Sequence, residues 1–109
     1  MQHTSTVLTQ TGINSGSLST ASNSVFIGTL KTVVALIEPA SGTITSSVIV
    51  FQCSDNNTDW YTTPANSGAM VAGANTAITL DGIAADYVRV IVGTASASPS
   101  TFNLVIQAK

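Results

Sequence analysis

Residues 48–63, VIVFQCSDNNTDWYTT, decide the fold of this chain. The stretch starts as an apolar run, breaks at the polar segment 55–59, and resumes with the only tryptophan, Trp60, followed by Tyr61. β-Branched and aromatic residues favour strands, whereas Asp and Asn accept the left-handed backbone and the local hydrogen bonds of a tight reversal. The stretch therefore predicts a β-hairpin with an aromatic return strand, in which Trp60 or Tyr61 fills the core.

Apolar, β-prone runs continue on both sides of this hairpin. Gly, Pro or Ser separates them, as in PASG at 39–42, and no window follows the helical period. Besides the return strand, we expect two short strands or one kinked strand within 24–37, and strands at 43–54, 75–81, 87–92 and 101–107. Seven or eight strands at roughly ten-residue spacing predict an all-β fold, an antiparallel β-sandwich of jelly-roll-like form.

The second half of the run 43–54 carries apolar residues at successive positions, which places them on both faces of a strand. Burial on both faces is typical of a central strand, or of a strand with one face covered by another subunit. We therefore expect this strand in the middle of its sheet or in contact with a neighbouring chain.

The first 23 residues differ from the rest in composition. They are rich in Ser, Thr and Gly, and their apolar positions after Met1 are Val7, Leu8, Ile13 and Leu18. We expect an extended N-terminal arm over residues 1–23, held in place by its own domain or by a partner. Residues 24–109 then form a single sandwich domain, since 109 residues suit one domain of ordinary size.

The chain carries unusually few charges. Only 7% of its residues are charged, against roughly 25% in a typical soluble protein. The net charge is −2, and Lys31, Arg89 and Lys109 are scattered along the sequence. Three scattered basic residues cannot release the counterions of a nucleic acid, so we expect no nucleic-acid partner. A surface of hydroxyl and amide groups costs little side-chain entropy to bury, which favours packing into an assembly.

From the sequence we expect no membrane-spanning segment and no signal peptide. No apolar run approaches the roughly 20 residues of a spanning helix. The N-terminus lacks a basic segment followed by an apolar core. Cys53 is the only cysteine, so no intrachain disulfide is possible, and its place in an apolar strand predicts a small buried side chain.

Catalytic, metal and cofactor sites are not expected. The single histidine, His3, lies in the terminal arm, which is a poor place to orient a general base. Asp55, Asn57 and Asp59 have the spacing that opens a calcium loop, but position 6 is Trp60 rather than Gly. The segment therefore predicts side-chain bonding within a turn, and we expect no enzyme activity and no cofactor.

Trp60 and Tyr61 raise the alternative of a carbohydrate site. Adjacent residues of a strand point to opposite faces, so one ring is expected in the core and the other outside. Such a pair cannot form a two-ring platform. A carbohydrate-binding module is kept as the alternative function.

Four segments of the sequence together resemble a known group of proteins. They are FQCS at 51–54, DNNTDWY at 55–61, AITLDG at 77–82 and ADYVRVIV at 85–92. Their order resembles a motif of small β-sandwich structural proteins of tailed bacteriophages and, more loosely, of discoidin-like sandwiches. The resemblance covers residues 48–92, under half of the chain. A discoidin-like domain is normally longer and closed by a disulfide, so the resemblance favours a structural role.

The resemblance implies a virion component on the outer surface of the particle, made in the host cytoplasm. The function expected is that of a head decoration or cement protein, with a tail-associated module as a related possibility. Its partners would be the major capsid protein or other virion subunits. Proteins of this kind act as homotrimers or as monomers at symmetry axes, and of these we expect a homo-oligomer, taken as a trimer. The alternatives are a carbohydrate-binding tail or fibre module and a self-assembling shell or tube subunit. We expect the arm over residues 1–23 to supply much of the anchoring.

Overall fold

Strands dominate the computed structural model, which describes residues 5–15, 20–28, 30–42, 48–69, 75–83, 85–94 and 100–109. Within these ranges the strands are β1 (Ser5–Asn14), β2 (Val25–Phe26), β3 (Val33–Gly42), β4 (Val48–Ser54), β5 (Tyr61–Ala69), β6 (Thr76–Leu80), β7 (Tyr87–Thr94) and β8 (Ser100–Ala108). Every pairing between them is antiparallel. The predicted all-β sandwich is confirmed. The described part of the chain holds no helix that could span a membrane.

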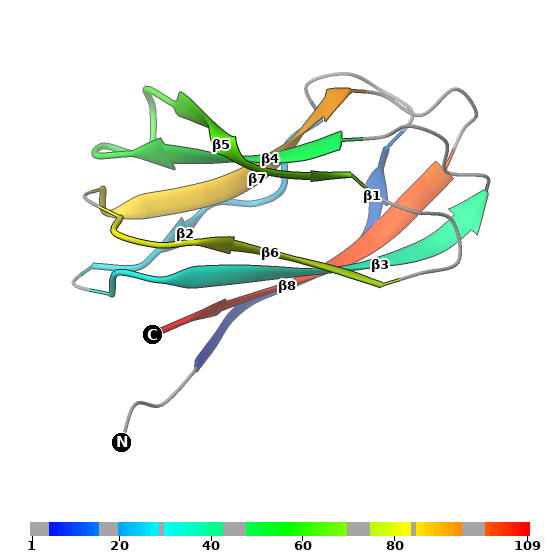
Figure 1. Cartoon of the computed structure of the whole chain (residues 1–109), viewed down its shortest axis with the longest axis horizontal. Coiled ribbons are helices and arrows are strands. Elements are labelled where there is room, and N and C mark those ends of the chain that lie inside the picture. The colour runs from blue at the N-terminus through cyan, green and yellow to red at the C-terminus, as the bar shows by residue number, and fades with distance from the viewer. Residues whose placement is uncertain are drawn as a thin grey trace.

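The strands form two four-stranded sheets. Sheet A has the order β1-β8-β3-β6, and sheet B has the order β2-β7-β4-β5 (Figure 1). The pairs β1–β8, β2–β7, β3–β6 and β4–β5 are all hydrogen-bonded, so the first half of the chain runs antiparallel to the second half from end to end. One long hairpin wrapped into two layers is the jelly-roll arrangement, as the sequence predicted.

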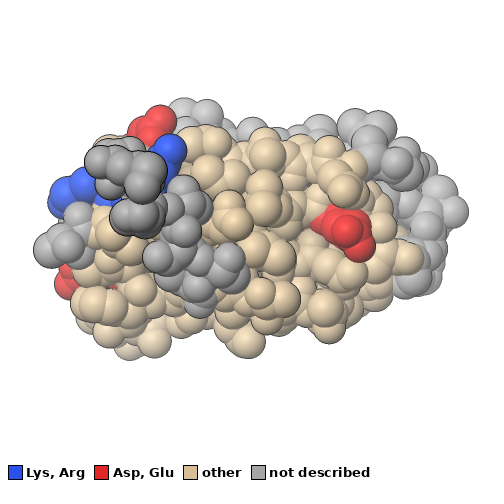
Figure 2. Space-filling model, turned by 90° about the horizontal axis from the view of Figure 1, so that it is seen from below, with Lys and Arg blue, Asp and Glu red and all other residues tan. Residues whose placement is uncertain are grey.

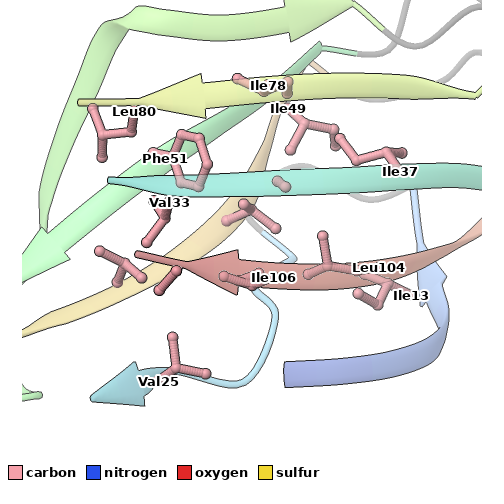
Figure 3. Close-up of a cluster of buried hydrophobic side chains, with 14 of the residues drawn as sticks. Ile13, Val25, Val33, Ile37, Ile49, Phe51, Ile78, Leu80, Leu104 and Ile106 are labelled. Carbon is pink, nitrogen blue, oxygen red and sulfur yellow. The ribbon is translucent and has the colours of Figure 1, made fainter. Parts of the chain in front are cut away.

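The core lies between the inward faces of the two sheets (Figure 3). In β8 every second residue is buried, and Phe102, Leu104 and Ile106 are fully enclosed. On the opposite sheet, alternate residues of β7 are buried in the same way, namely Val88, Val90 and Val92. Because strand side chains alternate between faces, this period-two pattern lets each sheet bury one face and leave the other outside.

Strand β4 occupies the middle of sheet B, as its two-sided apolar pattern predicted. Ile49 and Phe51 point into the core and are fully buried. Val50 lies on the outer face, yet it is only 9% exposed because it packs beside Ile91, its partner in the register, and beside Gly93. β4 lies between β7 and β5, so residues of a neighbouring strand cover part of its outer face.

Residues 5–14, expected in an arm, belong to the sandwich as strand β1. Ser5 pairs with Ala108, so the two ends of the described chain lie side by side (Figure 1). Ile13 enters the core at 4% exposure, and the Ser15 N–H donates to the Ser100 carbonyl over 2.9 Å. The domain itself holds this segment, so the boundary expected at residue 24 does not mark the start of the sandwich. Residues 1–4 and 16–19 lie outside the described residues.

The predicted hairpin and its turn chemistry are confirmed. The Asn56 Oδ1 accepts hydrogen bonds from the backbone N–H groups of Thr58 and Asp59, both at 2.9 Å, and its Nδ2 donates to the Asp59 carboxylate over 2.9 Å. Asn57 has a φ of 61°, the left-handed conformation that Asn tolerates. Side-chain bonding of this kind reverses the chain between β4 and β5.

Phe51 and Tyr61 provide a matched test of this core. Replacing Phe51 with Ala removes a fully buried ring and should lower the free energy of unfolding by about 3–5 kcal/mol. Replacing Tyr61 with Ala should change it by less than about 0.5 kcal/mol, since that ring is 69% exposed. Urea unfolding followed by circular dichroism measures both values. Equal losses from the two variants would contradict the described core.

Candidate binding surfaces on the two outer faces

The residues weighed for catalysis or metal binding do not come together among the described residues. His3 lies outside them. Cys53 is half-buried in β4 and packs against the core, and this burial raises the pKa of its thiol. A raised pKa leaves less of the reactive thiolate at neutral pH. In the part of the chain that the structure describes, no three His, Cys, Asp or Glu side chains are grouped to hold a metal ion.

The prediction that Trp60 or Tyr61 fills the core is wrong. Tyr61 is 69% exposed and Trp60 is partly exposed, while Phe51 and Phe102 supply the buried rings. Tyr61 opens β5, one of the two edge strands of sheet B, which pairs only with β4 among the described strands. Position in the sheet, and not ring size, therefore decides which aromatic residues are enclosed.

An aromatic surface lies on the outer face of sheet B. We call it the aromatic face and define it by Phe26, Trp60, Tyr87, Arg89 and Gln52. Phe26 and Tyr87 are direct partners in the register of β2 and β7, and their rings meet edge to face with centroids 5.4 Å apart. Phe26 is 63% exposed, although it is large and apolar. The aromatic face thus presents ring surface to a neighbour.

Arg89 is held in position at the centre of the aromatic face. Its guanidinium carbon lies 4.3 Å from the centroid of the Trp60 ring, a cation–π contact. Its Nε–H donates to the Gln52 Oε1 over 2.8 Å, and the Gln52 Nε2 donates in turn to the Thr62 hydroxyl over 3.2 Å. Partial burial lowers the pKa of Arg89. Stacking and hydrogen bonding fix the plane of the guanidinium before any partner arrives.

The residue types of the aromatic face favour noncatalytic binding to another macromolecule. Tyr, Trp, Phe and Arg are enriched at the centres of protein interfaces, where they supply most of the binding energy. A preorganised guanidinium and rigid rings lose little conformational entropy on contact. The sequence did not reveal this surface, because Phe26, Trp60 and Arg89 meet only through strand pairing.

A shallow hollow lies on the opposite side of the molecule, on the outer face of sheet A. Its volume is about 390 Å³. Ala77, Leu36 and Val105 are direct cross-strand partners and form an aliphatic row across β6, β3 and β8. The complete lining consists of Leu36, Ile37, Glu38, Asn75, Thr76, Ala77, Asn103 and Val105. Leu36 is 38% exposed, so the floor of the hollow is open and apolar.

Glu38 provides the charge beside this aliphatic row. Asn103, its partner in the register, donates from Nδ2 to the Glu38 carboxylate at 3.5 Å, the long end of the hydrogen-bond range. The Asn103 Oδ1 accepts from the Gly12 N–H over 3.2 Å, at an irregularity of β1 where Gly12 has a φ of 70°. Figure 2, seen from the side of β8 and β1, shows one acidic group set apart from the other charged side chains, which gather at the left end of the view.

Comparison of the chain with protein-family models, with curated proteins and with solved structures gave no match.

A double-mutant cycle tests the contact between Trp60 and Arg89. Trp60→Leu and Arg89→Met each remove one partner, and the cycle should give a coupling of about 0.5–1 kcal/mol. The same cycle between Trp60→Leu and Lys31→Met is the control and should give none, because Lys31 lies before β3 on the other sheet. Urea unfolding followed by circular dichroism supplies the free energies. A Trp60–Arg89 coupling no larger than the control would refute the stacked arrangement.

Proposed function

We propose that this chain is a noncatalytic structural subunit of a virion, a head decoration or cement protein on the outer surface of the particle. The observation that carries the proposal is the presence of an open contact surface on each of two opposite faces. The aromatic face carries Phe26 at 63% exposure, and the hollow carries Leu36 at 38% exposure. A domain with two such faces can contact two neighbours at the same time.

The composition of the surface supports this proposal. The chain has 7% charged residues, and its outward side chains on β8 are Thr101, Asn103, Val105 and Gln107. Thr101, Asn103 and Val105 are short and uncharged, so their burial in a lattice costs less side-chain entropy than burial of Lys, Arg or Glu would. Jelly rolls occur in viral capsid proteins as well as in lectins, and this analogy agrees with the resemblance of residues 48–92 to phage structural proteins.

The mechanism proposed is multivalent attachment. A cement protein contacts several shell subunits, and each contact can be weak because the second binding event takes place at high effective concentration. A homotrimer, the oligomer expected from the resemblance, would add its three contacts in the same way. Residues 5–15 and 20–23 are hydrogen-bonded within the sandwich, so the described part of residues 1–23 does not form a free arm.

Electron microscopy of purified particles tests the proposal directly. Particles that contain the protein should show it as regular density on the outer shell. Particles that lack the protein should be disrupted at a lower temperature, and adding the purified chain back should restore the higher temperature. Particles without its density, or an unchanged disruption temperature after add-back, would refute the cement function.

A carbohydrate-binding tail or fibre module is the second candidate. The observation that favours it is the exposure of Tyr61, whose ring is open to solvent at 69% beside a partly exposed Trp60. Aromatic rings of this kind present apolar surface with a polar tip.

A glycan array separates the two candidates. If the module binds sugars, the wild-type chain should bind a defined set of glycans, and Tyr61→Ala should lower that binding at least about tenfold while leaving the fold intact. Phe26→Ala is a matched control, because Phe26 is a similarly exposed ring, at 63%, on β2 at the other edge of sheet B. Absence of any glycan binding by the wild-type chain would eliminate this candidate.

A further inference from the structure

Each sheet contains one charged residue. In the four strands of sheet A it is Glu38, and in the four strands of sheet B it is Arg89. All other charged residues of the chain lie outside the strands, namely Lys31, Asp55, Asp59, Asp81, Asp86 and Lys109. Two opposite charges are thus placed singly on two otherwise uncharged sheets.

The two charges point away from each other. Glu38 lies on β3 and Arg89 on β7, both inner strands of their sheets. Their neighbours Ile37, Val88 and Val90 are buried in the core, so alternation directs Glu38 and Arg89 to the two outer faces. One copy of the chain cannot pair them, whereas two stacked copies can.

The surroundings of the two charges are complementary as well. Glu38 lies beside the hollow, whose floor is the aliphatic row of Ala77, Leu36 and Val105. Arg89 lies among rings, with Trp60 beneath its guanidinium and the exposed Phe26 on the same face. A hollow aliphatic surface with a carboxylate is complementary in chemistry to an exposed aromatic ring with a guanidinium on the same face.

We propose that the aromatic face of one copy docks on the hollow of a second copy, with Arg89 of the first facing Glu38 of the second. The two contact surfaces differ, so the interface is heterologous. Such an interface leaves a free aromatic face at one end and a free hollow at the other, and repeated docking gives a ring if the rotation closes and an open stack if it does not.

The outline of the face is of the order of an ordinary interface. Two principal extents of the molecule, 38 and 22 Å, lie in the plane of Figure 2. This outline is of the same order as the roughly 800 Å² that each partner contributes to a stable interface. Arg89 is already fixed by Trp60 and Gln52, so pairing it with a carboxylate costs little further ordering.

The inference goes beyond the proposed function, because it concerns contacts between copies of the chain in the absence of particles. If the chain does not associate with itself, the proposed attachment to a shell is not contradicted. If it does not bind a shell, the proposed association between copies is not contradicted.

Charge reversal tests the inference. Sedimentation velocity of the purified wild-type chain should show concentration-dependent association, as a discrete ring or a growing series. Glu38→Arg alone and Arg89→Glu alone should each weaken it at least about tenfold, because like charges then face each other. Asp55→Arg is the control, since Asp55 is exposed and lies in the hairpin turn after β4 rather than in a strand of either sheet, and it should associate as the wild type does.

Restoration distinguishes a lost interface from a damaged fold. An equimolar mixture of the two single variants should associate again, because every contact then joins opposite charges. The double variant Glu38→Arg with Arg89→Glu should also associate by itself. A wild-type chain that stays monomeric at millimolar concentration would overturn the inference. So would a Glu38→Arg variant that associates like wild type, or a mixture that remains as weak as its components.

Discussion

The pairing of β8 with two strands at once is the constraint on which the rest of the structure depends. β8 lies between β1 and β3, so it joins the first strand of the chain to an inner strand of sheet A. Its inward residues Phe102, Leu104 and Ile106 are fully buried against sheet B. β8 therefore closes the sandwich, and among the described strands of sheet A it is the one that pairs with β1. Most stabilising contacts join residues far apart in sequence, which is the situation in which loop-closure entropy opposes folding most strongly.

Low charge has two opposite consequences for this molecule. It removes the electrostatic repulsion and the flexible side chains that keep many small domains apart, so the outer faces are ready for contact. It also makes each remaining charge more selective, because a lone carboxylate or guanidinium on an uncharged face rejects a partner of the same sign. Glu38 and Arg89 occupy these positions, and each is held by a neighbouring amide, Asn103 and Gln52 respectively. The same faces that support the proposed role in a virion thus carry the information for orienting one subunit against another.

Much of the fold could be predicted from the sequence because its signals are local. The hairpin at 48–63 follows from β-prone residues around an Asp and Asn turn, and the bonds of Asn56 form within three residues of it. Alternation at 101–107 predicted the buried side of β8 for the same reason. The enclosure of Trp60 or Tyr61 was predicted wrongly, since enclosure depends on whether another strand covers the ring. β5 turned out to be an edge strand, which no local pattern records.

The candidate surfaces depend on strand register, so they could not be predicted from the sequence. Phe26 and Tyr87 are 61 positions apart, and Glu38 and Asn103 are 65 apart, yet each pair meets directly across two strands. By itself the sequence determined the class of the fold, its strand periodicity and its shortage of charge, because these are properties of neighbouring residues and of composition. Only the tertiary structure decided which strands are edges, that residues 5–14 belong to the sandwich, and that one acid and one base stand on opposite faces. Strand order and register fix those features, and both are set by the joint burial of two whole sheets.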